Sequence, residues 1–438
     1  MQIQQFRETV YQKIEKRADA TLDLIDALTV AGHVASPVAL SEEAAFQRQF
    51  STVYDVLEAG SLDVVGLAEL FYAAQSAESE TIGGYAVYAL DATRNERPAA
   101  ETAAERGYLK SQADAVAGVG YKFSWLVRLV KWRTSWVAPQ DVQRITPTST
   151  DAATAVAQVQ ALDQRGAQRK AVVVDSLYAS VVFLTAFLVT QTVAVLVRLR
   201  NNQVLYEKPS PQPPGRKGAP RKHGAKFKLA NPGRTPDQCE TITLLGQTVR
   251  LQAWHALHFH RLSALVGLVL CVEFLRPDRT RRFRYPLWLF WTGAPDLPLV
   301  ELCRMYLWRF AIEHAFRFLK QHLGLNANQS TNLHSIEHWM WLCALAYTQL
   351  LLMRHQVADL RPPWQRHPPL AQPHGLTPGQ VQRAASRFLL RLGTPAAPPR
   401  PAGKGTGRRL GFRPKPKTRF KVVYKTKNRA KTKQKSPV

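Results

Sequence analysis

From residue 1 to residue 80, apolar side chains recur every three to four positions, which is the spacing of one face of an α-helix. Residues 6–30 keep this spacing, and residues 41–59 keep it again after Ser41, a suitable N-cap residue that is followed by two acids. The pattern therefore predicts a separate small helical domain at residues 1–80.

From residue 82 the pattern changes to short apolar runs, which are typical of buried strands. These runs alternate with two helical stretches, the first of which is rich in Ala and Gln. Three strands followed by helix, strand, helix and strand predict an α/β fold. The expected strands are residues 85–96, 121–130, 135–145, 169–175 and 193–200, and the expected helices are residues 150–168 and 178–190.

Residues 207–236 interrupt this order, because they are rich in Pro, Gly and basic side chains and so are typical of a loop or arm. Short strand-like runs then return and continue to residue 298. Helical patterns follow at residues 299–323 and 335–354, and Pro-rich spacers begin after residue 360. The second half of the chain therefore resumes the α/β pattern only after a strand-rich interruption.

This order of patterns predicts the domain organisation. We expect one core built from residues 82–200 and 299–358, interrupted by a strand-rich insertion with a basic arm at residues 201–298. Residues 359–438 are expected to be a Pro-rich linker and a disordered basic tail.

One segment, residues 181–197, resembles a membrane span, but it is slightly short and has polar side chains at its centre. We interpret it as a core helix that runs into a buried strand. The N-terminus is polar and charged, unlike a signal peptide, and the four cysteines form no close-spaced pair. We therefore expect a cytoplasmic, nucleoid-associated protein that does not enter a membrane.

The net charge of +27 is distributed unevenly along the chain. Residues 1–80 hold 5 Lys and Arg against 13 Asp and Glu, whereas residues 401–438 hold 14 Lys and Arg and no acid. A basic body with a basic tail favours a polyanionic partner such as nucleic acid. RNA is an alternative to DNA on charge alone, but the chain lacks the alternating aromatic strand pattern of common RNA-binding domains.

A tyrosine, two cations and a carboxylate stand out in the otherwise apolar segment from residue 306 to residue 320. At 100° per residue, these four side chains fall within a stripe of about 60° on one helix. The alternative is a solvent-exposed Arg–Glu pair, but charges on a largely buried helix need partners or a polar ligand. The four residues are Tyr306, Arg309, Glu313 and Lys320.

Two further acids stand at the ends of predicted strands. Asp91 and Asp175 each follow an apolar run, and the carboxyl ends of strands are where α/β sheets place their sites. Each aspartate taken singly has an alternative role as a loop cap. Together with Glu313, however, they would form an oxygen-rich cage that suits two Mg²⁺ ions about 4 Å apart.

The spacing Tyr-x2-Arg-x3-Glu-x6-Lys resembles the signature of DDE transposases of bacterial insertion sequences, in the branch named for its Y-R-E-K motif. The segments around Asp91 and Asp175 resemble the family's two aspartate regions, although Leu177 stands where the family has glycine. The resemblance covers roughly residues 82–355, and it implies a ribonuclease-H-like core with an insertion domain.

The resemblance also implies roles for individual residues. Asp91, Asp175 and Glu313 would be the catalytic, metal-binding triad, holding two Mg²⁺ ions for which Mn²⁺ can substitute. Arg309 and Lys320 would bind phosphates beside the cleavage point, and Tyr306 would position the DNA backbone.

Basic side chains of the insertion are candidates for further DNA contacts. The arm at residues 215–228 combines flexible Gly and Pro with Lys and Arg, which favours phosphate binding over an idle solvated loop. The main candidates are Arg216, Lys217, Arg221 and Lys222. Three tryptophans of the insertion, Trp254, Trp288 and Trp291, could stack on an unpaired base, but we interpret them as core residues.

These inferences predict a cut-and-paste DNA transposase that cleaves at the ends of its own mobile element and joins them to target DNA. Its partners would be double-stranded DNA, as terminal inverted repeats and target, and a second copy of the chain in a homodimer. The alternative is a catalytically inactive, transposase-derived protein that binds DNA and does not cut it.

Overall fold

The computed structural model describes residues 1–75, 79–109, 118–210, 219, 221–360, 364, 375–400, 407, 409–413 and 415–423. The α-helices are α1 Ile3–Gln12, α2 Ala18–Val30, α3 Phe50–Ala59, α4 Val64–Ala73, α5 Asp151–Asp163, α6 Val181–Thr185, α7 Leu299–Trp308, α8 Ala311–Gln321, α9 Leu333–Met353 and α10 Pro378–Leu392. Short 3₁₀ helices are η1 Pro37–Glu42, η2 Ser176–Tyr178 and η3 Ala186–Leu188.

The strands are β1 Ile14–Lys16, β2 Ser61–Leu62, β3 Thr81–Ile82, β4 Tyr85–Glu96, β5 Gly107–Leu109, β6 Gly118–Leu129, β7 Val137–Arg144, β8 Lys170–Val174, β9 Val193–Leu199, β10 Val204–Glu207, β11 Lys226–Lys228, β12 Gln238–Leu244, β13 Gln247–Phe259, β14 Leu262–Leu275 and β15 Leu287–Trp291. The mixed α/β class predicted from the sequence is therefore confirmed.

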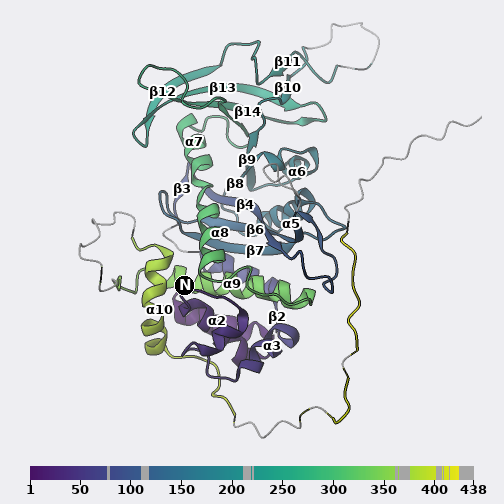
Figure 1. Cartoon of the computed structure of the whole chain (residues 1–438). Coiled ribbons are helices and arrows are strands. Elements are labelled where there is room, and N and C mark those ends of the chain that lie inside the picture. Colours follow the sequence, from purple (N-terminus) through teal and green to yellow (C-terminus); the bar gives the residue numbers. More distant parts are fainter. Residues whose placement is uncertain are drawn as a thin grey trace, which may run out of the picture.

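One large mixed sheet runs through the molecule (Figure 1). Its main path is β11-β10-β13-β14-β15-β9-β8-β4-β6-β5, with β12 beside β13, β3 beside β4 and β7 beside β6. Strands β4, β8 and β9 are parallel to one another, whereas β6 and β7 are antiparallel additions. The strands of the predicted insertion join this sheet through β15, which pairs with β9.

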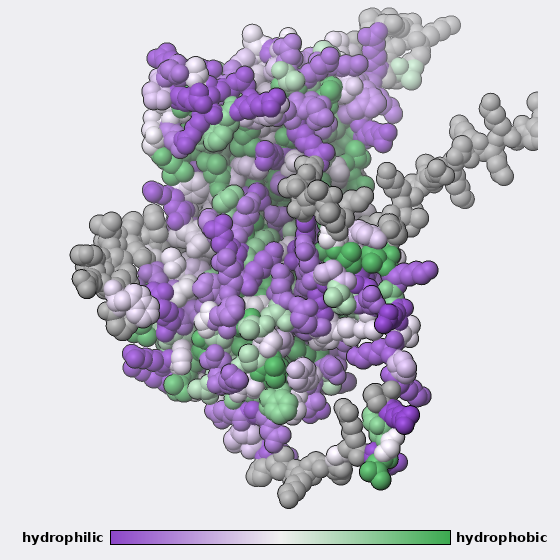
Figure 2. Space-filling view, in the orientation of Figure 1, coloured by the Kyte–Doolittle hydropathy of each residue, from purple (hydrophilic) through white to green (hydrophobic). Residues whose placement is uncertain are grey.

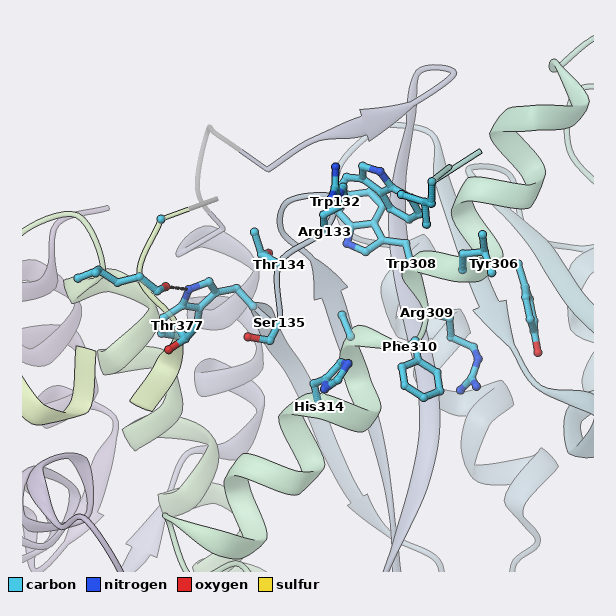
Figure 3. A pocket seen from close by; sticks show the side chains of 16 residues that line it. Trp132, Arg133, Thr134, Ser135, Tyr306, Trp308, Arg309, Phe310, His314 and Thr377 are labelled. Atoms are coloured by element: carbon cyan, nitrogen blue, oxygen red, sulfur yellow. Dashed lines mark hydrogen bonds between the residues drawn. The ribbon is translucent and has the colours of Figure 1, made fainter. Parts of the chain in front are cut away.

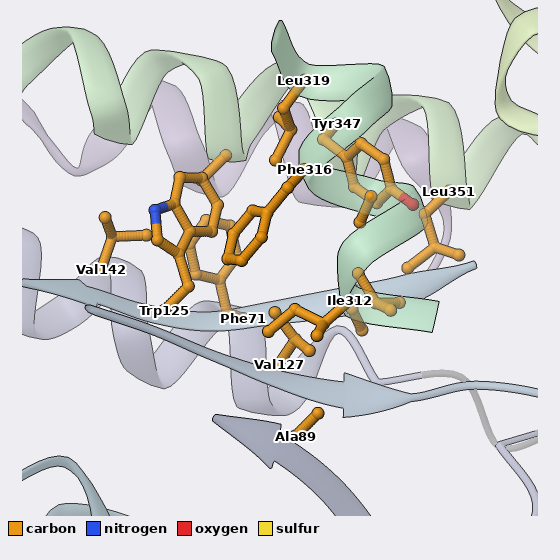
Figure 4. Packing of buried hydrophobic residues seen from close by; sticks show 14 of the residues in the cluster. Phe71, Ala89, Trp125, Val127, Val142, Ile312, Phe316, Leu319, Tyr347 and Leu351 are labelled. Carbon is orange, nitrogen blue, oxygen red and sulfur yellow. The ribbon is translucent and has the colours of Figure 1, made fainter. Parts of the chain in front are cut away.

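Helices cover both faces of the central strands. Side chains of β4 alternate between the two faces, so Val87 and Ala89 belong to the cluster that includes α7, α8 and α9. Tyr88 and Leu90 face the other way, toward α5 and α6. In Figure 4, Phe316 of α8 lies against Trp125 of β6, with ring centroids 6.0 Å apart, and this packing seats α8 on the sheet.

The N-terminal helices share their core with the rest of the chain. Asp26 of α2 is paired with Arg7 of α1 and accepts a hydrogen bond of 3.1 Å from Gln349 of α9. All three side chains are buried. The boundary at residue 80 stays a prediction, but this hydrogen bond ties α2 to a helix from the far end of the described core.

Some element predictions were right and others need correction. Residues 181–197 form α6, η3 and β9, as expected for a helix that leads into a buried strand. Ser41 was expected to cap a helix, but it lies inside η1, and α3 begins only at Phe50. Helix α10 was also missed: a capping box at Thr377 starts it within residues predicted to be linker.

Part of the C-terminal tail lies against the body of the protein. The N–H groups of Phe420 and Val423 donate to the carbonyls of Glu101 and Arg106, at 2.8 and 2.7 Å. Figure 1 shows this segment in yellow, running along one side of the molecule to reach the loop that follows β4. Residues 415–423 are therefore not free of the core, contrary to the prediction of a disordered tail, while residues 424–438 lie outside the described part.

Candidate active site

Strand pairing brings Asp91 and Asp175 together. The parallel strands β4 and β8 are last paired at Ala89 and Val173, and each aspartate stands two residues later along the chain. Asp175 directly follows the end of β8, as predicted, whereas Asp91 lies inside β4, which continues to Glu96 instead of ending at the aspartate. The same parity places both aspartates on the face covered by α8. Asp175 also accepts a 2.8 Å hydrogen bond from the N–H of Leu177, which caps η2.

Glu313 reaches this pair from the first turn of α8, and Arg309 joins them. One guanidinium nitrogen of Arg309 is 3.2 Å from an oxygen of Asp91, and the other is 2.6 Å from an oxygen of Glu313. The Arg309 side chain is only 10% exposed, so solvent screens these contacts weakly. Carboxylates from two separate elements, β4 and α8, thus share a single cation.

A break in the helix places Arg309. The segment predicted as one continuous helix is in fact two, because α7 ends at Trp308 and α8 begins at Ala311. Across the break the backbone uses i to i−3 hydrogen bonds: Phe310 donates to Leu307 at 3.3 Å and Ile312 donates to Arg309 at 3.0 Å. Such a 3₁₀-like turn is tighter than an α-helix, so a spacing of 100° per residue does not hold through it.

The break divides the four motif residues between two helices. Tyr306 lies in α7, Arg309 lies in the break itself, and Glu313 and Lys320 lie in α8. Tyr306 is buried at the end of α7, and the guanidinium carbon of Arg309 is 5.8 Å from its ring centroid. Lys320 is exposed in the last turn of α8, about 10 Å beyond Glu313 at 1.5 Å per residue. The charged groups that act on Lys320 are Arg94 and Glu96, so its neighbours are not the three carboxylates of the site.

Burial and like charges set the electrostatics of the site. Burial raises the pKa of Asp91 to about 6, Arg309 opposes the rise, and Asp175 and Glu313 add to it. Burial works against the charged form of Arg309, but Asp91, Tyr306 and Glu313 outweigh it and the pKa of Arg309 is raised. The cation therefore stays charged and holds together acids that would otherwise repel one another.

Tyr178 was not singled out from the sequence, although it stands three residues after Asp175. Its side chain is fully buried against Phe183, with ring centroids 5.3 Å apart. Desolvation, followed by Asp91 and Asp151, raises its pKa well above the ordinary value, so the phenol stays neutral. An aromatic residue three positions after an aspartate at the end of a strand was the available signal, and the pKa effect of Asp91 and Asp175 places Tyr178 near both acids.

The donor type suits a divalent metal ion, but the arrangement does not. Carboxylate oxygens are hard ligands of the kind that Mg²⁺ prefers. Among the residues that the structure describes, however, no three His, Cys, Asp or Glu side chains are close enough to form a metal site. Arg309 occupies an oxygen of Asp91 and an oxygen of Glu313, so metal binding would require these ion pairs to open.

A cavity of about 920 Å³ lies beside the helix break (Figure 3). Its walls are largely apolar and include the aromatic residues Trp132, Trp136, Trp308 and Phe310. The side chain of Phe310 is 51% exposed, and Trp136 donates to the carbonyl of Leu376 at 2.7 Å. The turn that carries Arg309 is therefore packed on one side and faces open space on the other.

The basic arm is remote from the acids along the sheet. Arg221 and Lys222 are exposed near β11, and β11 is seven strands from β4, or about 34 Å at 4.8 Å per strand. Arg216 and Lys217 lie outside the described residues. The tryptophans of the insertion are buried in the sheet, at 3% exposure for Trp254 and Trp288 and 1% for Trp291, as their interpretation as core residues required.

Carboxylates from neighbouring strands and a helix, with a buried arginine between two of them, are typical of enzymes that act on phosphodiesters. The comparison with protein families is more specific. Residues 9–261 match the DDE superfamily endonuclease family, and this match spans more than half of the chain. The chain therefore belongs to the DDE superfamily endonucleases.

The family assignment covers part of the candidate site. The matched residues include Asp91 and Asp175 and end before Glu313 and Arg309. The family acts on DNA and generally uses divalent metal ions. A comparison with curated proteins found no match. Among the described helices, none has the length and apolar character needed to cross a membrane.

Proposed function

We propose that this protein is a cut-and-paste DNA transposase of an insertion sequence, in the branch with the Y-R-E-K signature. The observation that carries the proposal is the meeting of Asp91 and Glu313 on one buried arginine, with Asp175 directly after the adjoining strand. The family match supports the nuclease class, and the motif that supplies Arg309 and Glu313 supports the branch.

In this proposal the strands around Asp91 and Asp175 form a ribonuclease-H-like core of residues 82–200 and 299–358. Residues 201–298 are the insertion and residues 1–80 the N-terminal helical region. Residues 359–438 form the linker and tail. Two copies of the chain would hold the two inverted repeats of the element, because both ends must be cut and joined together.

The catalytic acids would be Asp91, Asp175 and Glu313, and they would hold Mg²⁺, with Mn²⁺ as a substitute. Such ions activate the attacking oxygen and stabilise the leaving oxygen of a phosphodiester. Since Arg309 is paired with Asp91 and Glu313, we propose that it releases both carboxylates when DNA binds. Its guanidinium would then donate its hydrogen bonds to a phosphate. The cavity next to Phe310 leaves room for that movement.

The other motif residues have supporting roles in this scheme. Lys320, exposed at the end of α8, would bind a phosphate farther along the same strand. Tyr306 is buried under Arg309, so we propose that it orients the guanidinium and acts on the DNA backbone only through it. Arg216, Lys217, Arg221 and Lys222 would contact duplex DNA away from the cleavage point.

An excision assay tests the proposal. A marker flanked by the DNA that borders this gene is exposed to wild-type protein or to Glu313→Gln. We expect loss of the marker with the wild type alone. If neither protein removes the marker while both bind the flanking DNA, the chain is a DNA-binding protein without cleavage activity, which is the alternative left open by the sequence.

A further inference from the structure

The turn between β14 and β15 concentrates positive charge on the surface of the insertion. Residues 276–285 contain five arginines and one acid, and every one of them is exposed. Figure 2 shows hydrophilic side chains over much of this end of the molecule. The arginines are Arg276, Arg279, Arg281, Arg282 and Arg284.

The turn has a defined backbone. The N–H of Arg279 donates to the carbonyl of Arg276 at 2.9 Å, across a β-turn with Pro277 in its second position. Asp278 accepts from the N–H and hydroxyl of Thr280, at 2.9 and 2.6 Å. The N–H of Arg282 then returns to the carbonyl of Phe274 at 2.8 Å. The arginines are thus presented by an ordered hairpin end.

Arg279 occupies a position that glycine would fill more easily. Its φ of 63° is in the left-handed region, where a side chain other than glycine is strained. A turn followed by a left-handed residue is a common hairpin connection, and glycine usually stands there. An arginine at this position destabilises the fold, so we expect its side chain to have a role other than stabilising the turn.

The charges of the turn are only partly compensated within the protein. Glu273 of β14 pairs with Arg281 at 3.6 Å and with Arg250 at 3.3 Å. In the part of the chain that the structure describes, no carboxylate lies within ion-pair distance of Arg279, Arg282 or Arg284. Like charges gathered within a Debye length repel one another, and a polyanion would relieve that repulsion.

Aromatic rings alternate with the last arginines of the turn. Phe283 and Tyr285 are 55% and 56% exposed. The guanidinium carbon of Arg282 is 5.7 Å from the ring centroid of Phe283, and that of Arg284 is 5.1 Å from the centroid of Tyr285. Cations that bind phosphates beside exposed rings that stack on bases are the features of single-strand binding surfaces.

We propose that residues 276–285 bind single-stranded DNA, with Arg279, Arg282 and Arg284 on phosphates and Tyr285 stacked on an unpaired base. The inference rests on the proposed function for the source of that strand, which is the DNA opened at a cut element end. No part of the predicted basic arm or of the metal-binding acids is required for it.

Binding is measured by fluorescence anisotropy with a 20-nucleotide single strand and with the duplex of the same sequence, using the Glu313→Gln protein so that nothing is cut. Tyr285→Ala should weaken single-strand binding about tenfold, since stacking contributes about 1–3 kcal/mol per base, and should change duplex binding much less. Tyr285→Phe keeps the ring and should restore binding. Equal losses on both DNAs, or no loss on the single strand, would overturn the proposal.

Charge variants give a second, independent measure. Arg282→Gln with Arg284→Gln should lower the salt dependence of single-strand binding by about 1.4, at about 0.7 per cation. The matched control, Arg387→Gln with Arg391→Gln on the exposed face of α10, removes the same charge elsewhere and should have a smaller effect. If the control changes the slope as much as the turn variant, the turn has no special role.

Arg279→Gly separates binding from folding. It removes a cation and relieves the left-handed strain, so the melting temperature should stay the same or rise while single-strand affinity falls. A variant that melts earlier and binds normally would contradict the assignment. All these measurements are independent of cleavage: if the wild type fails to excise its element but the turn variants lose binding, the proposed function falls and this inference stands.

Discussion

At the scale of single residues, the site depends on one cation. Arg309 stands between Asp91 and Glu313, in surroundings where burial is the main cause that raises the pKa of Asp91 to about 6. Removing one partner of a buried charge pair is costly because the remaining charge is left without compensation. Arg309 therefore affects both the stability of the site and, in the proposed function, its chemistry.

Replacing Arg309 by alanine should reduce excision by at least about 100-fold, as expected when a donor aimed at the reacting phosphate is lost. Overall duplex affinity should change little, because many other cations contribute to it. Excision and anisotropy on the same preparation measure the two effects. Arg317→Ala, which removes an exposed arginine from the same helix, is the control. Equal losses of excision and binding would remove Arg309 from the cleavage point.

His338 provides a prediction about pH. The imidazole is buried in α9, and burial, followed by the neighbouring His334, lowers its pKa to about 4. Between about pH 6.5 and 4 the unfolded chain therefore binds a proton that the folded chain excludes, so this contribution to stability falls as the pH falls. The loss reaches about 3 kcal/mol at the acid end.

Denaturant unfolding of wild type and His338→Leu at pH 7, 5.5 and 4.5 tests whether this contribution to stability falls as the pH is lowered. The difference in unfolding free energy between the two proteins should shift in favour of the variant as the pH is lowered. Comparing the pair cancels the buried aspartates Asp23 and Asp26, whose pKa values burial raises to about 6 and which titrate in the opposite sense. A difference that does not vary with pH would show that His338 is protonated or exposed.

At the scale of elements, α8 matters because it carries Glu313 to two strands from another part of the chain. Its position on the sheet depends on buried side chains such as Ile312 and Phe316. The 3₁₀-like turn before α8 then fixes where Arg309 points. Neither a proline nor a glycine stands at this turn, so the sequence contains no ordinary sign of the break.

Phe316→Ala tests how the helix is held. Deleting a buried aromatic side chain should cost about 3–5 kcal/mol of unfolding free energy, and Phe316→Leu should cost clearly less because most of the volume is kept. Excision should follow the same order, since a loosened α8 misplaces Glu313. Urea unfolding and the excision assay are the measurements. A large loss of stability with normal excision would mean that α8 does not position the glutamate.

At the scale of the whole molecule, segments distant in sequence are built into one structure. The sheet includes strands from both the core and the insertion, and α9 ties the N-terminal helices to the central strands. The tail returns to the loop after β4 and presents exposed Lys415, Lys417, Arg419 and Lys421 along its described part. The exposed cations of the described tail therefore lie beside the loop after β4, far along the sheet from those near β11.

Deleting residues 404–438 removes 14 cations and should lower the affinity for non-specific duplex DNA, with a smaller dependence on salt. The slope of log affinity against log salt falls by about 0.9 for each phosphate contact that is lost. Anisotropy titrations between about 50 and 200 mM salt would measure it. The melting temperature serves as the control for folding, and a slope equal to that of the full chain would show that the tail does not touch DNA.

The sequence by itself determined much of this protein. Apolar runs located β4 and β8, since a buried strand needs an uninterrupted apolar stretch. A polar residue marked the end of β8 before Asp175 but not the end of β4, which continues past Asp91 to Glu96. The spacing of Arg309 and Glu313 marked them as a pair, and their i to i+4 ion pair is present. The α/β class followed from the order of helices and strands, because each element type has its own periodicity.

Other features were decided only by the tertiary structure. Arg309 bridges an acid 218 residues away in sequence and its neighbour four residues on, and no local pattern specifies the distant contact. The helix break, the joining of the insertion strands to the core sheet and the docking of the tail all depend on long-range packing. Local periodicity reports which face of an element is buried, but the partner that buries it is chosen by the fold as a whole.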